Sequence, residues 1–121
     1  MKYFTFLLSL LMAFQMTSQS PIMQPSISPD ATQIAFSLQG DIWVAQINGE
    51  NPRRLTLHEA YEGNPVWSED GKHLIFSSDR FGNDDLFRVP ATGGIPDRLT
   101  YHSAADMPYS VSPNGEILFT T

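Results

Sequence analysis

One sequence pattern occurs three times in this chain of 121 residues. A short apolar segment, a four-residue turn and an alternating segment occupy residues 65–77, and residues 25–37 repeat this pattern 40 positions earlier without a gap. A third copy, at 109–120, has one residue fewer between the turn and the second segment. Repeats of about 40 residues that consist of strand-like segments are typical of β-propellers and related arrays.

The turn at the centre of each copy has a defined chemistry, which is complete in Ser112-Pro113-Asn114-Gly115. Proline favours the backbone angle of the second turn position, Asn or Asp bonds nearby backbone N–H groups, and glycine closes the turn. The other two copies depart at one position each, with Ala31 in place of glycine and Glu69 in place of proline. We therefore expect the turn in all three copies.

Apolar side chains stand two positions apart after each turn, so they point to one face of a strand. We expect them to pack in the core, as aromatic and branched residues usually do. They are Ile34 and Phe36, Leu74 and Phe76, and Ile117 and Phe119.

Ten strands are predicted, because turn residues separate short apolar or alternating segments throughout the chain after residue 21. The predicted strands are 24–28, 33–38, 41–47, 52–56, 64–68, 73–78, 84–89, 96–100, 107–111 and 116–121. They form an all-β fold, a partial β-propeller of about two and a half four-stranded antiparallel blades at 24–60, 61–104 and 105–121. Almost no helix is expected in this part.

The first 20 residues differ from the rest of the chain. Lys2 precedes a nearly unbroken apolar run over 3–14, and a polar segment follows it. This layout predicts a helical signal peptide over 1–20, with cleavage after Ser18 or Ser20, and hence an exported protein that is periplasmic or secreted. The run is too short to span a bilayer comfortably, which takes about 20 residues. An N-terminal membrane anchor is the alternative.

Composition excludes several kinds of partner and site. The chain has no cysteine, so it forms no disulfide and offers no cysteine-based metal site. It carries 13 Asp and Glu against 7 Lys and Arg, which argues against nucleic acid as a partner. We expect contact with the membrane only through the signal peptide.

The sequence contains no recognisable catalytic, cofactor-binding or metal-binding set of residues. No serine lies in a Gly-x-Ser-x-Gly elbow. His58 and His102 occupy equivalent repeat positions, so each is expected to serve its own blade, and a zinc site needs three or four convergent ligands. Asp79, Asp84 and Asp85 lack the alternate spacing and closing Glu of a calcium loop, and we interpret them as part of a capped hairpin.

Two charged positions recur in the repeat. Asp41 corresponds to Asp85, and Arg54 corresponds to Arg98. These residues are expected to pair either between strands of one blade or between blades, and to fix the strand register.

These motifs resemble the β-propeller repeats of TolB and of tricorn-type proteases. The likeness rests on residues 25–36, on Gly40-Asp41-Ile42-Trp43 and on Arg53-Arg54-Leu55-Thr56, and a second copy follows in residues 70–100. It covers residues 24–121, nearly all of the chain after the predicted signal peptide.

A signal peptide followed directly by a propeller is most similar to the start of an exported tricorn-like serine peptidase. The resemblance implies a propeller that guides or gates peptides, with the catalytic serine, histidine and glutamate far beyond residue 121. The alternatives are a TolB-like propeller that binds proteins without catalysis, and the front end of a propeller-fused amidohydrolase or a prolyl-oligopeptidase-like peptidase.

A ring of this type needs about four blades or more, because each blade buries its faces against its neighbours. Two and a half blades would leave an unpaired strand edge and exposed apolar flanks. We therefore expect the sequence to be a fragment of a longer protein, which itself can form homo-oligomers. A small domain that completes its ring by oligomerising is the alternative.

Overall fold

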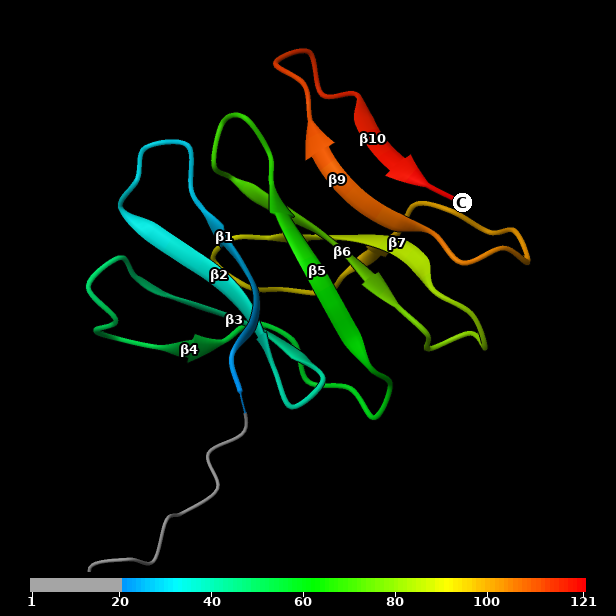
Figure 1. The fold of residues 1–121 in the computed structure, drawn as a ribbon, viewed down its shortest axis with the longest axis horizontal. Helices are drawn as coiled ribbons and strands as arrows, with labels where there is room; N and C mark the ends of the chain where they lie inside the picture. The colour runs from blue at the N-terminus through cyan, green and yellow to red at the C-terminus, as the bar shows by residue number, and fades with distance from the viewer. Residues whose placement is uncertain (1–20) are drawn as a thin grey trace, which may run out of the picture.

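The computed structural model describes residues 21–121, which form ten β-strands and contain no helix (Figure 1). The predicted signal peptide at 1–20 lies outside the described residues. Within residues 21–121, no helix long and apolar enough to cross a membrane is found.

The strands form two four-stranded sheets and one hairpin, all antiparallel and paired in chain order. The first sheet consists of β1 (Met23–Ile27), β2 (Gln33–Leu38), β3 (Asp41–Gln46) and β4 (Arg53–Arg54). The second consists of β5 (Glu62–Trp67), β6 (His73–Ser78), β7 (Asp85–Pro90) and β8 (Asp97–Arg98). The hairpin pairs β9 (Met107–Val111) with β10 (Ile117–Thr120).

All ten predicted strands are present, but β4 and β8 are shorter than expected, with two residues each. In each sheet, a threonine side chain explains why the pairing between the third and fourth strands ends early. The Thr56 hydroxyl accepts a hydrogen bond from the Ile42 backbone N–H at 2.9 Å, and Thr100 does the same for Leu86 at 2.9 Å. A backbone donor of the third strand is thus satisfied by a threonine hydroxyl, so the fourth strand ends there.

The predicted turn forms in all three copies. Each is closed by a backbone hydrogen bond of 2.9 Å, from Ala31 to Ser28, from Gly71 to Ser68 and from Gly115 to Ser112. The fourth turn residue has a left-handed conformation in each copy, with φ of 58° at Ala31, 69° at Gly71 and 86° at Gly115. Alanine therefore occupies a backbone conformation that favours glycine.

The core lies between the first and second sheets. Because side chains alternate along a strand, each sheet presents one face to its neighbour. Ala35, Ile42, Val44 and Leu55 of the first sheet form one buried cluster with residues of the second sheet. The second sheet contributes Trp67, Leu74, Phe76, Phe87, Val89 and Ala91.

The repeated aromatic residues keep their register. Phe36 pairs with Trp43 across β2 and β3, and Phe76 pairs with Phe87 across β6 and β7. The rings of Phe76 and Phe87 stack with centroids 5.9 Å apart. Phe119 takes the same position in β10 and is half-buried.

The repeated charged pairs lie within each sheet and not between sheets. Arg54 on β4 binds Asp41 on β3, and Arg98 on β8 binds Asp85 on β7 at 2.6 Å. Of the two arrangements that the sequence allows, the structure therefore has pairing between neighbouring strands of one sheet. One ion pair connects β4 to β3, and the other connects β8 to β7.

The first strand of each sheet has an irregular register. A shift falls between Met23 and Ser26 in β1 and between Gly63 and Val66 in β5. Gln24 and Asn64, at equivalent positions, have left-handed φ values of 54° and 52°. Such bulges bend a strand and redirect its side chains.

Replacing Ala31 with glycine is expected to raise the free energy of unfolding by about 0.5–1 kcal/mol. A non-glycine residue in the left-handed region costs about 1–2 kcal/mol, and the larger unfolded-state entropy of glycine offsets part of this gain. Urea unfolding followed by tryptophan fluorescence measures the change. Ala104→Gly, at an exposed loop residue without a left-handed φ, is the matched control and is expected to destabilise the chain. A loss of stability in Ala31→Gly would contradict the expected relief of strain.

The Ser68 hydroxyl holds the pKa of Asp70 below its ordinary value of 3.8, helped by the Lys72 backbone N–H. Ser68→Ala is expected to move this pKa upward toward 3.8 in an NMR titration. A carboxyl with a lowered folded-state pKa stabilises the fold above its unfolded pKa, and this contribution is lost as the pH falls through the folded value. The variant should therefore have a lower free energy of unfolding than the wild type at neutral pH. Between about pH 4 and 2, its free energy of unfolding should fall less steeply than that of the wild type. Asp30, held in the same way by Ser28, is the internal control and should not shift.

Candidate functional site

The first strands of the three sheets lie side by side. β5 contacts β1 on one side and β9 on the other, and the three run next to one another in Figure 1. In a ring of blades, the strands that meet at the inner edge line the central channel. This array of β1, β5 and β9, called here the inner-strand surface, is the candidate functional site.

Two hollows lie along the inner-strand surface, and each is lined by residues from all three sheets. One has a volume of about 340 Å³ and the other of about 240 Å³. Tyr109 of β9 lines both and is 65% exposed. Ile27 of β1, 59% exposed, lines the larger hollow. The surface therefore presents apolar and aromatic groups beside polar backbone.

Direct hydrogen bonds hold the inner strands together. The Asn64 backbone N–H donates to the Gln24 side-chain carbonyl at 2.8 Å, and the Trp67 indole N–H donates to the Ser26 carbonyl at 2.8 Å. Both bonds join the first sheet to the second. The spacing of β1 and β5 is thus fixed by the groups that line the surface.

An acidic hollow of about 350 Å³ lies between the turns of the first two sheets. Asp30, Glu69 and Asp70 line it. The hydroxyls of Ser28 and Ser68 lower the pKa of Asp30 and Asp70 respectively, so both carboxylates are charged at neutral pH. This end of the inner-strand surface is suited to positively charged ligands.

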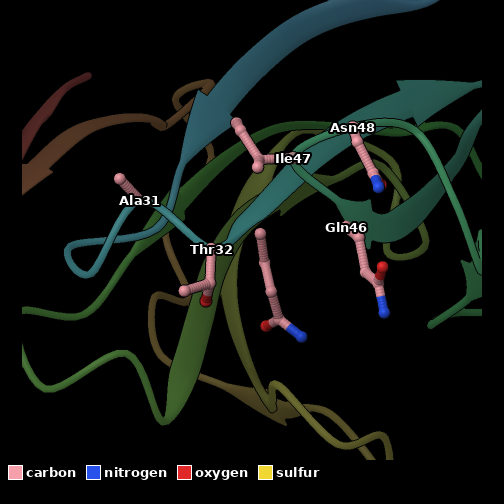
Figure 2. A pocket seen from close by; sticks show the side chains of 6 residues that line it. Ala31, Thr32, Gln46, Ile47 and Asn48 are labelled. Atoms are coloured by element: carbon pink, nitrogen blue, oxygen red, sulfur yellow. The ribbon is translucent and has the colours of Figure 1, made fainter.

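A second group of hollows lies on the first sheet, away from the second. A hollow of about 460 Å³ with a mixed polar and apolar lining is formed at the ends of β2 and β3, where Figure 2 shows Thr32, Ile47 and Asn48 around it. Asn48 is engaged by its own turn, because its side-chain oxygen accepts from the Glu50 backbone N–H at 3.0 Å. Next to it, an apolar hollow of about 560 Å³ exposes the face of the sheet that carries Phe36 and Trp43.

The three histidines lie on separate elements. The His58 ring accepts from the Ala60 backbone N–H at 3.0 Å, and the His102 ring lies 3.5 Å from the Asp106 carboxylate. His73 lies within β6. Within residues 21–121, no group of three or more His, Asp or Glu side chains that could hold a metal ion is found.

The three aspartates Asp79, Asp84 and Asp85 flank the β6–β7 connection. Asp79 accepts from the Tyr61 backbone N–H ahead of β5 at 2.8 Å, and Asp85 binds Arg98 on β8. Burial, together with the charges of Asp79 and Asp85, raises the pKa of Asp84.

Sequence reasoning missed Tyr109, Glu62 and Asp106. The sequence predicts a strand around Tyr109 but not that its side chain is exposed, because this exposure depends on how the three sheets are arranged. Glu62 and Asp106 are buried carboxylates, and both stand six residues before the serine of their turn. Aligning the repeats further upstream would have found the equivalence of these two.

The chain matches the model of the tricorn protease N-terminal beta propeller domain over residues 19–121. It is 30% identical to the uncharacterized peptidase YuxL of Bacillus subtilis, over 93% of this chain and 19% of that protein. It is 32% identical to a protein of Streptomyces coelicolor assigned as tricorn protease homolog 2, over 68% of this chain and 7% of that protein.

A solved structure has the same architecture. The protein from Agrobacterium tumefaciens assigned as TolB superimposes with a TM-score of 0.76 and 30% sequence identity, over 86% of this chain and 39% of that one. The chain thus spans a fifth or less of the two curated relatives given above, and less than half of this structure.

These matches agree with the repeated turns and the four-stranded sheets. The chain is a β-propeller segment of the tricorn and TolB type, and it belongs to the family of the tricorn protease N-terminal β-propeller domain.

Proposed function

We propose that this chain is the N-terminal propeller segment of an exported tricorn-like serine peptidase, and that it guides or gates peptides on their way to a catalytic domain elsewhere in the protein. The observation that carries the proposal is the inner-strand surface. It joins exposed aromatic and apolar side chains from successive blades to an acidic rim, in a chain of the tricorn propeller family.

The names of two relatives support a peptidase as the parent. One is an uncharacterized peptidase and the other is assigned as a tricorn protease homologue. Because the chain covers only 19% and 7% of these proteins, the activity of the whole protein is part of the proposal. The basic, apolar and polar order of residues 1–20 supports export, with the propeller beginning at residue 21.

The chemistry of the surface suits an extended, unfolded peptide. Tyr109 and Ile27 offer contact area for apolar side chains, and the charged Asp30 and Asp70 attract basic ones. No residue of this chain is assigned a catalytic, cofactor or metal role, and hydrolysis is assigned to the remote domain.

A TolB-like propeller that binds proteins without catalysis is the second candidate. The superposition with the Agrobacterium tumefaciens structure supports it, with 30% sequence identity over 86% of this chain. In that case the ligand of the inner-strand surface would be a folded protein.

Peptide binding tests the proposal. A fluorescein-labelled ten-residue peptide with two lysines is titrated into the 121-residue chain and followed by fluorescence anisotropy. Tyr109→Ala is expected to weaken binding about fivefold or more, as loss of a central aromatic contact does. Tyr101→Ala removes a similarly exposed tyrosine outside the inner strands and is the matched control.

Three further results bear on the same proposal. A peptide with two glutamates in place of the lysines should bind more weakly, because the rim is acidic. A fluorophosphonate probe should leave the chain unlabelled, since the proposal assigns the nucleophile to another domain. Equal binding by wild type and Tyr109→Ala would overturn the assignment of the inner-strand surface, and binding of folded proteins alone would support the TolB-like candidate.

A further inference from the structure

The tripeptide Asn-Gly-Glu occurs twice in this chain, at residues 48–50 and 114–116. Both copies lie in exposed turns, the first between β3 and β4 and the second between β9 and β10. The glycine has almost the same conformation in each, with φ of 87° at Gly49 and 86° at Gly115. A Cβ atom added at either glycine would meet nothing within 4 Å. The two sites therefore share their local sequence and their open surroundings.

Asparagine followed by glycine is prone to deamidation, because glycine has no side chain to shield its backbone nitrogen. This nitrogen attacks the side-chain carbonyl carbon of the asparagine. A C–N bond forms, and the side-chain amide leaves as ammonia together with the proton of the attacking nitrogen. Water then opens the cyclic imide at either of its two C–N bonds, which gives aspartate or isoaspartate. The reaction needs no reagent other than water.

The two sites differ in the group that holds the asparagine side chain. The Glu50 backbone N–H donates to the Asn48 side-chain oxygen at 3.0 Å. In the second copy, the Glu116 backbone N–H donates instead to the Ser112 hydroxyl, also at 3.0 Å. Among the described residues, the Asn114 side-chain oxygen accepts only from that hydroxyl. A hydroxyl hydrogen can rotate to follow its acceptor, whereas a backbone N–H is fixed by the turn. The Asn114 amide is therefore the less constrained of the two.

The attacking nitrogens are held alike at the two sites. The Gly49 N–H donates to the Gln46 carbonyl at 2.8 Å, and the Gly115 N–H donates to the Ser112 carbonyl at 2.9 Å. Each nitrogen has to give up one bond of this kind before it attacks. The constraint on the asparagine amide is thus what distinguishes the two sites.

The length of the third repeated turn explains why it lacks a backbone donor for its asparagine. In the second sheet, the Lys72 N–H donates to the Asp70 carboxylate at 2.9 Å, and the His73 N–H donates to the Ser68 hydroxyl at 3.0 Å. The third copy has one residue fewer after the turn. A single N–H, that of Glu116, is then available for two acceptors, and it donates to the serine hydroxyl.

We propose that Asn114 is a site of spontaneous deamidation, and that it reacts faster than Asn48. The position is open to water within the repeat, because the equivalent Asp70 is exposed although its sheet has a neighbour on each side. The aspartate product has the residue that the other two turns carry at this position. The isoaspartate product adds a methylene group to the backbone of the turn. The inference does not depend on the proposed function.

Peptide mapping of the 121-residue chain tests the proposal. The chain is kept in mildly alkaline buffer, sampled over time and cut with trypsin, and the deamidated form of each peptide is measured by mass spectrometry. Cleavage after lysine and arginine places Asn114 in peptide 99–121 and Asn48 in peptide 3–53. The other asparagine of these peptides, Asn51, precedes a proline, whose nitrogen carries no hydrogen.

The initial rate of deamidation in peptide 99–121 is expected to be about fivefold higher than in peptide 3–53, the effect of one net backbone hydrogen bond. Unfolding is the matched control. In urea both asparagines lie in the same tripeptide without their turns, so the two rates should become equal. Equal rates in the folded chain, a faster reaction at Asn48, or a difference that persists in urea would overturn the proposal.

An insertion tests the cause of the difference. A lysine placed between Gly115 and Glu116 gives the third turn the length of the second, and so supplies a backbone N–H for the Asn114 side chain. It is expected to slow the reaction at Asn114 about fivefold and to leave the rate at Asn48 unchanged. An unchanged rate at Asn114, in a variant that keeps the unfolding midpoint of the wild type, would contradict the role of the missing donor.

Asn114→Gln checks the assignment of the reacting residue. Glutamine forms its cyclic imide much more slowly, because the ring is larger, so peptide 99–121 should then lose its deamidated form. Deamidation that continues in this peptide would overturn the assignment to Asn114.

Discussion

The packing of one sheet face against the next determines the rest of this structure. A single four-stranded sheet has two apolar faces, because side chains alternate along each strand, and it can cover neither by itself. The first sheet covers one face on the second through the cluster around Ile42, Val44, Phe76 and Phe87. The opposite face of the first sheet, around Phe36 and Trp43, is left with an apolar hollow. The same requirement for a neighbour places β1, β5 and β9 together and so forms the inner-strand surface.

Charged residues in this fold act as connections between strands that have few backbone bonds. β4 and β8 have two residues each, and the pairs of Arg54 with Asp41 and Arg98 with Asp85 join them to the strand before. Since Asp41 and Asp85 are buried, removing one arginine would leave a buried charge without a partner, which is costly. These positions therefore tolerate change poorly, although the arginines themselves are partly exposed.

Much of the fold could be predicted because the repeat displays the same turn three times. The bounds of β2, β6 and β9 agree with the prediction, since a defined turn or a clear change in polarity marks their ends. β4 and β8 were predicted too long, because the threonine hydroxyls that end them act through tertiary geometry that no local pattern shows. The candidate site was harder to predict. The role of Tyr109 depends on three strands from separate repeats meeting at one edge, and the equivalence of Glu62 and Asp106 lies upstream of the segment where the repeats are easiest to align.

The bulges at Gln24 and Asn64 have a consequence for how the inner-strand surface can diversify. Where an extra residue interrupts a strand, the rule that every second side chain faces the core no longer holds, and neighbouring positions can turn toward the inner-strand surface without loss of buried apolar area. Substitutions on this surface are thereby separated from substitutions in the interior. One scaffold can in this way vary the side chains it presents while its blades continue to stack.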